Sequence, residues 1–250
     1  LHIYKTIEKT SPKAKNSIVM GPFSHGGWSH EMGKHFHNEI YFGDSIATFY
    51  QKNIETTFFN HYLKNEKSAI NLPEAYMFDT GKKEWKQFAE WPPKAAQKTQ
   101  FYLRENGKFT TEIPSSASFT EYFSDPNKPV PSSTNLKEFN GFTPRNYMSE
   151  DQRFTENRPD VASFTTEILS DDITLAGEIK VKLKIASTGS DADFFVKLID
   201  IYPADEKNIK EKPGVIYGNY HQMVRSEIMP ARFRNSFEKP ETLVPNQETE

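Results

Sequence analysis

The hydrophobic pattern of this chain changes its period near residue 64, and this change limits the folds open to its 250 residues. Between Asp44 and this point, apolar residues recur every three or four positions, which is the spacing of an amphipathic helix. From Ile70 onward, short runs alternate between apolar and polar residues, which is the spacing of strands. The sequence therefore predicts an α+β chain in which residues 1–66 and 67–250 belong to different domains.

Two further elements are expected before the long helix of the first domain. Residues 1–10 keep a helical spacing up to Ser11-Pro12, where a helix must stop. The apolar run Ile18–Met20 has the length of a buried strand, and Gly21-Pro22 ends it. A helix that feeds a buried strand is the repeating unit of a parallel sheet, so we expect the other strands of this sheet to come from elsewhere.

Residues 67–250 predict a β-sandwich. Hairpins are expected in residues 75–88 and 101–109, the second around Asn106-Gly107, a strong hairpin signal. Asp172–Ile185 has the cleanest alternation in the chain, with lysines on its polar side, and predicts a strand with one solvated face. A strand at Asp193–Tyr202 is apolar on both faces and is therefore expected to be central. A further strand is expected at His221–Met229, and surface loops at residues 124–144 and 204–219.

The composition excludes several classes of partner and site. A net charge of −3 provides no broad basic face for nucleic acid or an anionic membrane. No apolar run approaches the roughly 20 residues of a membrane span. The chain has no cysteine, which excludes disulfides and thiolate ligands. The 20 Phe and 11 Tyr suit a sandwich core better than a helical bundle.

His25 is the candidate catalytic residue, because it follows the Ile18–Met20 strand on a glycine-flanked loop. α/β-Hydrolases present their general base in this way, and their triad residues occur in the order Ser, Asp or Glu, then His. Before His25 the only acidic residue is Glu8, and no G-x-S-x-G motif is present. If His25 is catalytic, its nucleophile and acid therefore precede Leu1. The alternative is an ordinary loop histidine.

Gly43–Ala47 nearly fits a nucleophile elbow, the sharp turn that presents a catalytic serine. It follows the histidine instead of preceding it, and no strand leads into it. It also stands where the helix to Leu63 needs a cap. We therefore interpret Asp44 and Ser45 as capping residues.

Two groups of residues could bind metal, and each has a simpler explanation. The first is a loop rich in histidine and glutamate, in which His35 and His37 would point to one side if they lay on a strand. The H-E-x-x-H spacing is not met, and a solvated loop is the simpler explanation. The second is a set of aspartates for which turn capping is the simpler role, because calcium needs six or more oxygen ligands. The groups are His25, His30, His35, His37, Glu31 and Glu39, and Asp191, Asp193, Asp200 and Asp205. Trp28, Trp85 and Trp91 could line a substrate surface, but aromatic residues more often pack in a core.

Several segments, in the same order, resemble one hydrolase family. Gly21–Trp28 (GPFSHGGW) resembles the G-P-W-x-H motif of the cocaine-esterase-like hydrolases, which include X-Pro dipeptidyl peptidases, α-amino acid ester hydrolases and glutaryl acylases. The sequence departs from that motif at Phe23, where Trp is usual. Further segments are similar to the family's last catalytic-domain helix, its Arg-Pro-Asp-Val-x-x-Phe segment, its signature sandwich strand and the strand after it: residues 44–63, 152–164, 191–203 and 225–234.

The resemblance implies a parent protein with an α/β-hydrolase core, an inserted helical cap and a C-terminal jelly-roll β-sandwich. Residues 1–66 would be the last helix–strand–helix piece of the catalytic domain. Residues 67–250 would be the jelly roll, truncated at its C-terminus. His25 would be the base of a Ser-His-Asp triad whose serine and aspartate lie upstream.

Two functions follow as hypotheses. In the first, the chain is the C-terminal part of a serine hydrolase, inactive alone, whose partners are the upstream catalytic domain of the same parent chain and a small acyl ester, amide or peptide substrate. In the second, it is a non-catalytic β-sandwich module that binds carbohydrate or peptide. Neither requires a cofactor, a metal, nucleic acid or a membrane. A metal hydrolase built on the histidine-rich loop is a third alternative.

Overall fold

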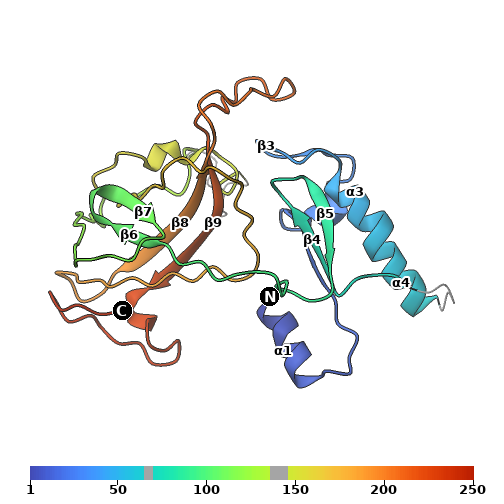
Figure 1. Ribbon diagram of the computed structural model, residues 1–250, viewed down its shortest axis with the longest axis horizontal. Coiled ribbons are helices and arrows are strands. Elements are labelled where there is room, and N and C mark those ends of the chain that lie inside the picture. Colours follow the sequence, from blue (N-terminus) through green and yellow to red (C-terminus); the bar gives the residue numbers. More distant parts are fainter. Residues whose placement is uncertain (65–69, 136–145) are drawn as a thin grey trace. The chain divides into compact units, whose positions relative to one another are not determined.

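The computed structural model describes residues 1–64, 70–135 and 146–250, which form two compact units (Figure 1). The first unit comprises Leu1–Glu121 and Ala162–Gly177, and the second comprises Tyr122–Val161 and Glu178–Glu250. The predicted domain boundary between residues 66 and 67 lies outside the described residues and stays a prediction. Within the described part of the chain, no helix has the length and hydropathy needed to cross a membrane.

The first unit contains most of the regular structure. Its elements are α1 (His2–Thr10), β1 (Ile18–Met20), α2 (Gly27–His30), β2 (Phe36–His37), β3 (Ile40–Tyr41), α3 (Ile46–Phe49), the π-helical η1 (Tyr50–Glu55), α4 (Thr56–Leu63), β4 (Ala75–Asp79), β5 (Glu84–Phe88), β6 (Tyr102–Arg104), η2 (Glu105–Gly107) and β7 (Lys108–Thr110). The predicted helices, the first strand and both hairpins are therefore present.

A three-stranded sheet in the order β1-β4-β5 forms the centre of this unit. β1 runs parallel to β4, with Ile18 opposite Ala75, and β4 pairs antiparallel with β5. The buried cluster of this sheet combines strand residues with one residue of α1: Ile18, Ala75 and Met77 with Tyr4. The Tyr4 hydroxyl donates a hydrogen bond of 2.7 Å to Glu74, just before β4. The expectation that the partners of the first strand come from elsewhere was wrong for β4, which pairs with it although the sequence placed residues 75–88 in the sandwich domain.

The long helix packs one end of its apolar stripe against the sheet. α3, η1 and α4 follow one another without a break, and the α3 end contacts β4 and β5 through Phe49. Ile46, Ala47 and Ile54 are buried, and the ring of Phe49 stacks on Trp85 of β5 at a centroid distance of 5.5 Å. The apolar side chains of α4 are largely exposed: Phe58, Phe59, Tyr62 and Leu63. The π-helical turns change the helical period between the two ends, so the stripe does not stay on one face.

The second unit is built around one long antiparallel pair. β8 (Asp193–Ile201) and β9 (His221–Pro230) pair along their lengths, with an irregularity between Leu198 and Ile199. Two short 3-10 helices accompany them, η3 (Gln152–Thr155) and η4 (Ala231–Phe233). Both predicted strands are present. In the described residues, however, β8 pairs only with β9, and Phe195 is 69% exposed, so its predicted central position was wrong.

The predicted strand at Asp172–Ile185 was also wrong. Only Ile185 pairs, in an isolated antiparallel bridge to Thr249. Apolar side chains of the segment are about half exposed: Ile173 52%, Leu175 51%, Ile179 48% and Val181 51%. A strand exists only where a neighbouring strand satisfies its backbone groups. Alternation predicts which side chains share a face, but it does not supply that neighbour. The predicted loop 204–219 has no strand or helix, and residues 136–144 of the predicted loop 124–144 lie outside the described residues.

A buried polar network packs against β8 and β9. Gln152 is fully buried, its amide donates to the Glu150 carbonyl at 2.8 Å, and its Oε1 accepts a 2.7 Å hydrogen bond from Lys197 of β8. Asp151 accepts hydrogen bonds from Arg153 at 2.6 Å and from the His221 backbone of β9 at 3.2 Å. Partial burial pushes the pKa of Asp151 up, but these hydrogen bonds outweigh it and hold the pKa below its usual value.

Replacing Ile18 by Ala is expected to lower the free energy of unfolding by about 2–4 kcal/mol, because it leaves a cavity in the buried cluster. Ile3 is 75% exposed, so Ile3→Ala, the matched control, should change it by less than about 0.5 kcal/mol. Urea unfolding followed by tryptophan fluorescence reports on this unit, since all three Trp lie in it. Equal effects of the two substitutions would contradict the assigned core.

Asp151→Asn is expected to lower the free energy of unfolding by about 1 kcal/mol at pH 7, because it removes the charged acceptor of a partly exposed pair. A carboxylate with a lowered pKa stabilises the fold fully above its unfolded pKa of about 3.9, and this contribution is lost as pH falls through the folded pKa. The difference between variant and wild type should therefore disappear in strong acid. Urea unfolding followed by circular dichroism, with the exposed Asp205→Asn as control, measures it. A difference independent of pH would refute the role of the pair.

Candidate active-site loop

His25 lies on the turn that follows β1, beyond the carboxyl end of the parallel pair β1 and β4. Its side chain is exposed, and its ring meets Trp28 edge-on at a centroid distance of 6.3 Å. No hydrogen bond joins this ring to another residue that the structure describes. Gly26 follows with φ of +76°, a left-handed conformation that favours glycine, and begins the single turn of α2. The imidazole is thus presented to solvent by a tightly turned loop.

Aromatic packing fixes the loop before His25. The ring of Phe23 contacts Tyr50 of η1 at 5.6 Å and Trp85 of β5 at 6.4 Å between centroids. A Cβ on Gly21 would lie 2.6 Å from the Phe23 ring, so only glycine allows the ring this position. Phe23, the one departure from the family motif, is therefore a packing residue.

Hydrogen bonds fix the loop after His25. The Ser24 hydroxyl donates to Glu31 Oε1 at 3.0 Å, and the other carboxylate oxygen of Glu31 lies 3.9 Å from Nδ1 of His37. The backbone N–H of Gly27 donates to the Ser24 carbonyl at 2.8 Å. Gln51 of η1 donates to the Trp28 carbonyl at 2.9 Å. The spacing of Ser24 and Glu31 matches no motif, so sequence reasoning did not identify this pair.

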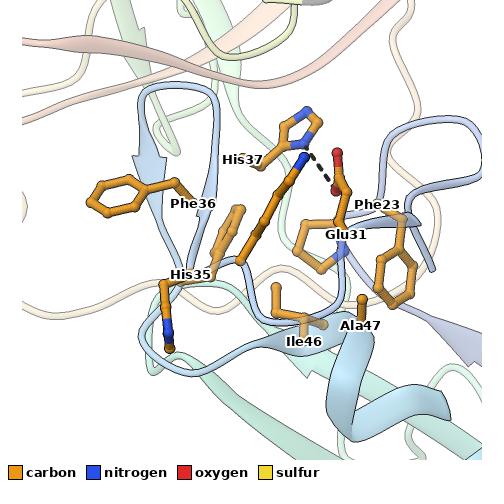
Figure 2. A pocket seen from close by; sticks show the side chains of 10 residues that line it. Phe23, Glu31, His35, Phe36, His37, Ile46 and Ala47 are labelled. Carbon is orange, nitrogen blue, oxygen red and sulfur yellow. Dashed lines mark ion pairs between the residues drawn. The ribbon is translucent and has the colours of Figure 1, made fainter. Parts of the chain in front are cut away.

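A shallow pocket, open to solvent, lies beside this loop (Figure 2). It is lined by residues of the loop region, of β2 and of α3, among them Phe23, Glu31, His37, Ile46 and Ala47. The dashed line in Figure 2 marks the ion pair between His37 and Glu31. His25 is not one of its lining residues. The pocket is therefore formed by residues that support the loop, and the imidazole does not face into it.

The two groups that could bind metal do not assemble. The Nδ1–H of His35 donates to the Gly43 carbonyl at 2.7 Å, whereas His37 faces Glu31, and the two rings are turned apart (Figure 2). Among the described residues, no three His, Asp or Glu side chains come close enough to hold a metal ion.

Two aspartates of the second group are hydrogen-bonded to an arginine. Arg232 donates to Asp191 at 2.7 Å and to Asp193 at 3.3 Å. The Arg232 hydrogen bond holds the pKa of Asp191 below its usual value, and burial raises the pKa of Asp200.

The capping role predicted for Ser45 is confirmed. Its hydroxyl accepts the Thr48 N–H at 3.3 Å as the cap of α3, and also accepts the Gly33 N–H at 2.9 Å. Asp44 accepts the Ser45 N–H at 2.7 Å. Ser45 is buried at the helix terminus.

Of the tryptophans, Trp85 packs among aromatic rings and Trp91 packs on the buried cluster, whereas Trp28 is 39% exposed.

Comparison with known proteins identifies the family. Residues 68–250 match the X-Pro dipeptidyl-peptidase C-terminal non-catalytic domain. The chain belongs to this family. The resemblance to the C-terminal portion of the cocaine-esterase-like hydrolases, predicted from the motifs, is therefore confirmed, and the β-rich class of the second part agrees with it.

Known relatives extend the similarity beyond the family domain. The chain is 30% identical to cocaine esterase from Rhodococcus sp. (strain MB1 Bresler) over 233 residues, which is 87% of this chain and 38% of that protein. Its structure matches an α-amino acid ester hydrolase with a TM-score of 0.87 at 30% identity, over 99% of this chain and 41% of that one. It also matches an aminopeptidase from a marine sediment archaeon (Thaumarchaeota archaeon) with a TM-score of 0.82 at 28% identity, over 99% and 40%. The chain thus spans about two fifths of each relative.

Ser45→Ala is expected to lower the free energy of unfolding by about 1 kcal/mol, because the Thr48 N–H loses its acceptor, whereas the Gly33 N–H keeps the Thr48 hydroxyl. Ser17 is exposed and makes no side-chain hydrogen bond to another described residue, so Ser17→Ala is the matched control and should have no measurable effect. Thermal unfolding of the two variants tests this. If Ser45→Ala is as stable as the control, the hydroxyl has another role.

Proposed function

We propose that this chain is the C-terminal part of a serine hydrolase that cleaves ester or amide bonds, with His25 as the general base of a Ser-His-Asp triad. The observation that carries the proposal is the exposed imidazole on the turn beyond β1, in a chain similar to an esterase, an ester hydrolase and an aminopeptidase. A ring without a hydrogen bond inside the described residues is free to meet a serine and a carboxylate from the rest of a hydrolase.

The chemistry assigned to His25 is proton relay. As a serine hydroxyl attacks the substrate carbonyl, the ring nitrogen that faces it takes the hydroxyl proton, and it then gives that proton to the leaving alcohol or amine. Water repeats the cycle on the acyl-enzyme and releases the acid. The second ring nitrogen donates to the aspartate, which fixes the tautomer. Serine and aspartate lie, on this proposal, in a part of the parent protein outside this chain, which spans about two fifths of its longer relatives.

The remaining residues have a supporting role in this proposal. Residues 1–66 are the last helix–strand–helix piece of the catalytic domain, and residues 67–250 are a jelly-roll β-sandwich without catalytic groups. The family match, which begins at residue 68 and describes a non-catalytic domain, supports this division, as does the long antiparallel pair of β8 and β9. The partners are the upstream catalytic domain and a small acyl ester, amide or peptide.

Replacing His25 by Ala in the full-length protein is expected to lower kcat by about 10⁶-fold, because a triad base is removed while folding is kept. The nearby His30 is exposed and lies outside the triad, so His30→Ala is the matched control and should retain activity. Hydrolysis of a chromogenic acyl ester measures both. The 250-residue chain alone should show no turnover. A fully active His25→Ala variant would instead favour the non-catalytic module that binds carbohydrate or peptide.

A further inference from the structure

The turn that presents His25 has little regular structure of its own. α2, which follows it, is a single turn of four residues, and an isolated turn of this length is unstable in water. The position of the imidazole therefore depends on contacts that join the loop to its surroundings. On the side before His25, Phe23 provides them by packing against Tyr50 and Trp85.

On the side after His25, Gln51 of η1 holds the Trp28 carbonyl, and one carboxylate makes the contact that reaches back to the residue before His25. Glu31 immediately follows α2, and its backbone N–H donates to the Gly27 carbonyl at 3.0 Å. Its side chain folds back over α2, so that Oε1 accepts the Ser24 hydroxyl at 3.0 Å. Ser24 is the residue directly before His25. The Ser24–Glu31 hydrogen bond thus closes the segment that contains the imidazole.

Two further observations show that the Glu31 side chain is held in this place. A Cβ on the buried Gly27 would lie 2.8 Å from Glu31 Oε2 and 3.0 Å from the Ser24 hydroxyl, so these two groups fill the space above Gly27. Oε2 of Glu31 also faces Nδ1 of His37 at 3.9 Å, and the side chains are only 25% and 18% exposed. The carboxylate therefore connects the His25 turn to the β2–β3 hairpin (Figure 2).

We propose that Glu31 is a positioning residue for His25: its carboxylate holds Ser24 and so fixes the turn from which the imidazole reaches a serine. The inference rests on the proposed hydrolase function. Glu31 does not transfer a proton in it. Its contribution is the alignment of a base that has to lie within hydrogen-bond reach of the nucleophile, where a shift of about 1 Å can cost about 100-fold in rate.

Substitutions of Glu31 in the full-length protein test this role with an acyl ester substrate. Glu31→Ala should lower kcat by about 10- to 100-fold with little change in KM, because the base is misplaced while substrate contacts remain. Glu31→Gln keeps an oxygen that accepts the Ser24 hydroxyl, so it should recover most of this loss. Ser24→Ala should resemble Glu31→Ala, and the double variant should be no worse than either single variant, since both remove the same bond. Glu84→Ala, an exposed site on β5, is the matched control.

The outcomes separate this inference from the function on which it rests. If His25→Ala abolishes turnover and Glu31→Ala keeps kcat within twofold of wild type, the positioning role is wrong and the hydrolase function stands. If Glu31→Gln is as impaired as Glu31→Ala and both lose thermal stability in parallel, Glu31 is only a structural residue and the inference also fails. If His25→Ala is fully active, the hydrolase function fails and the positioning role fails with it.

Discussion

The parallel pairing of β1 with β4 is the constraint on which the first unit depends. β1 has only three residues, and its pairing places Ile18 opposite Ala75 across more than fifty residues of chain. Without β4 this strand would have no partner in the described residues, and the turn after it would have no defined direction. The pairing also crosses a family boundary, because β4 and β5 lie in the segment matched as a non-catalytic domain, whereas His25 lies before it. That segment therefore contributes directly to the sheet from which His25 projects.

A layer of aromatic rings packs the loop after β1 against the paired strands and the helix. Trp85 of β5 contacts Phe49 of α3 and Phe23 of the loop, so helix, hairpin and loop share one packed layer. Large rings bury much apolar surface at a low cost in conformational entropy, which suits a support that must not move. The imidazole itself lies outside this layer, exposed and edge-on to Trp28. A packed layer beneath a solvent-accessible ring suits the role of general base that is proposed for His25.

The sequence predicted the parts of this arrangement that rest on local signals. The helix start at Ser45, the end of β1 at Gly21-Pro22 and the hairpin of residues 75–88 each follow from short patterns of turn, cap and period. The partner of β1 could not be predicted, because the parallel pairing joins distant segments. The Ser24–Glu31 bond was missed for a related reason, since it forms only after α2 has turned the carboxylate back. The role of His25 came from the order of motifs, and it remains a proposal.

The same distinction explains the error at Asp172–Ile185. Its alternation is the most regular in the chain, yet only Ile185 pairs, whereas the less regular β8 and β9 form a long ladder. The difference lies in what surrounds them: Lys197 of β8 and the His221 backbone of β9 are held by Gln152 and Asp151. Polar groups that are buried, as Gln152 is, or partly buried must be satisfied in one arrangement, so they favour a register that apolar surface alone does not. In the second unit the long ladder thus coincides with the polar network, whereas alternation by itself is not sufficient for a strand.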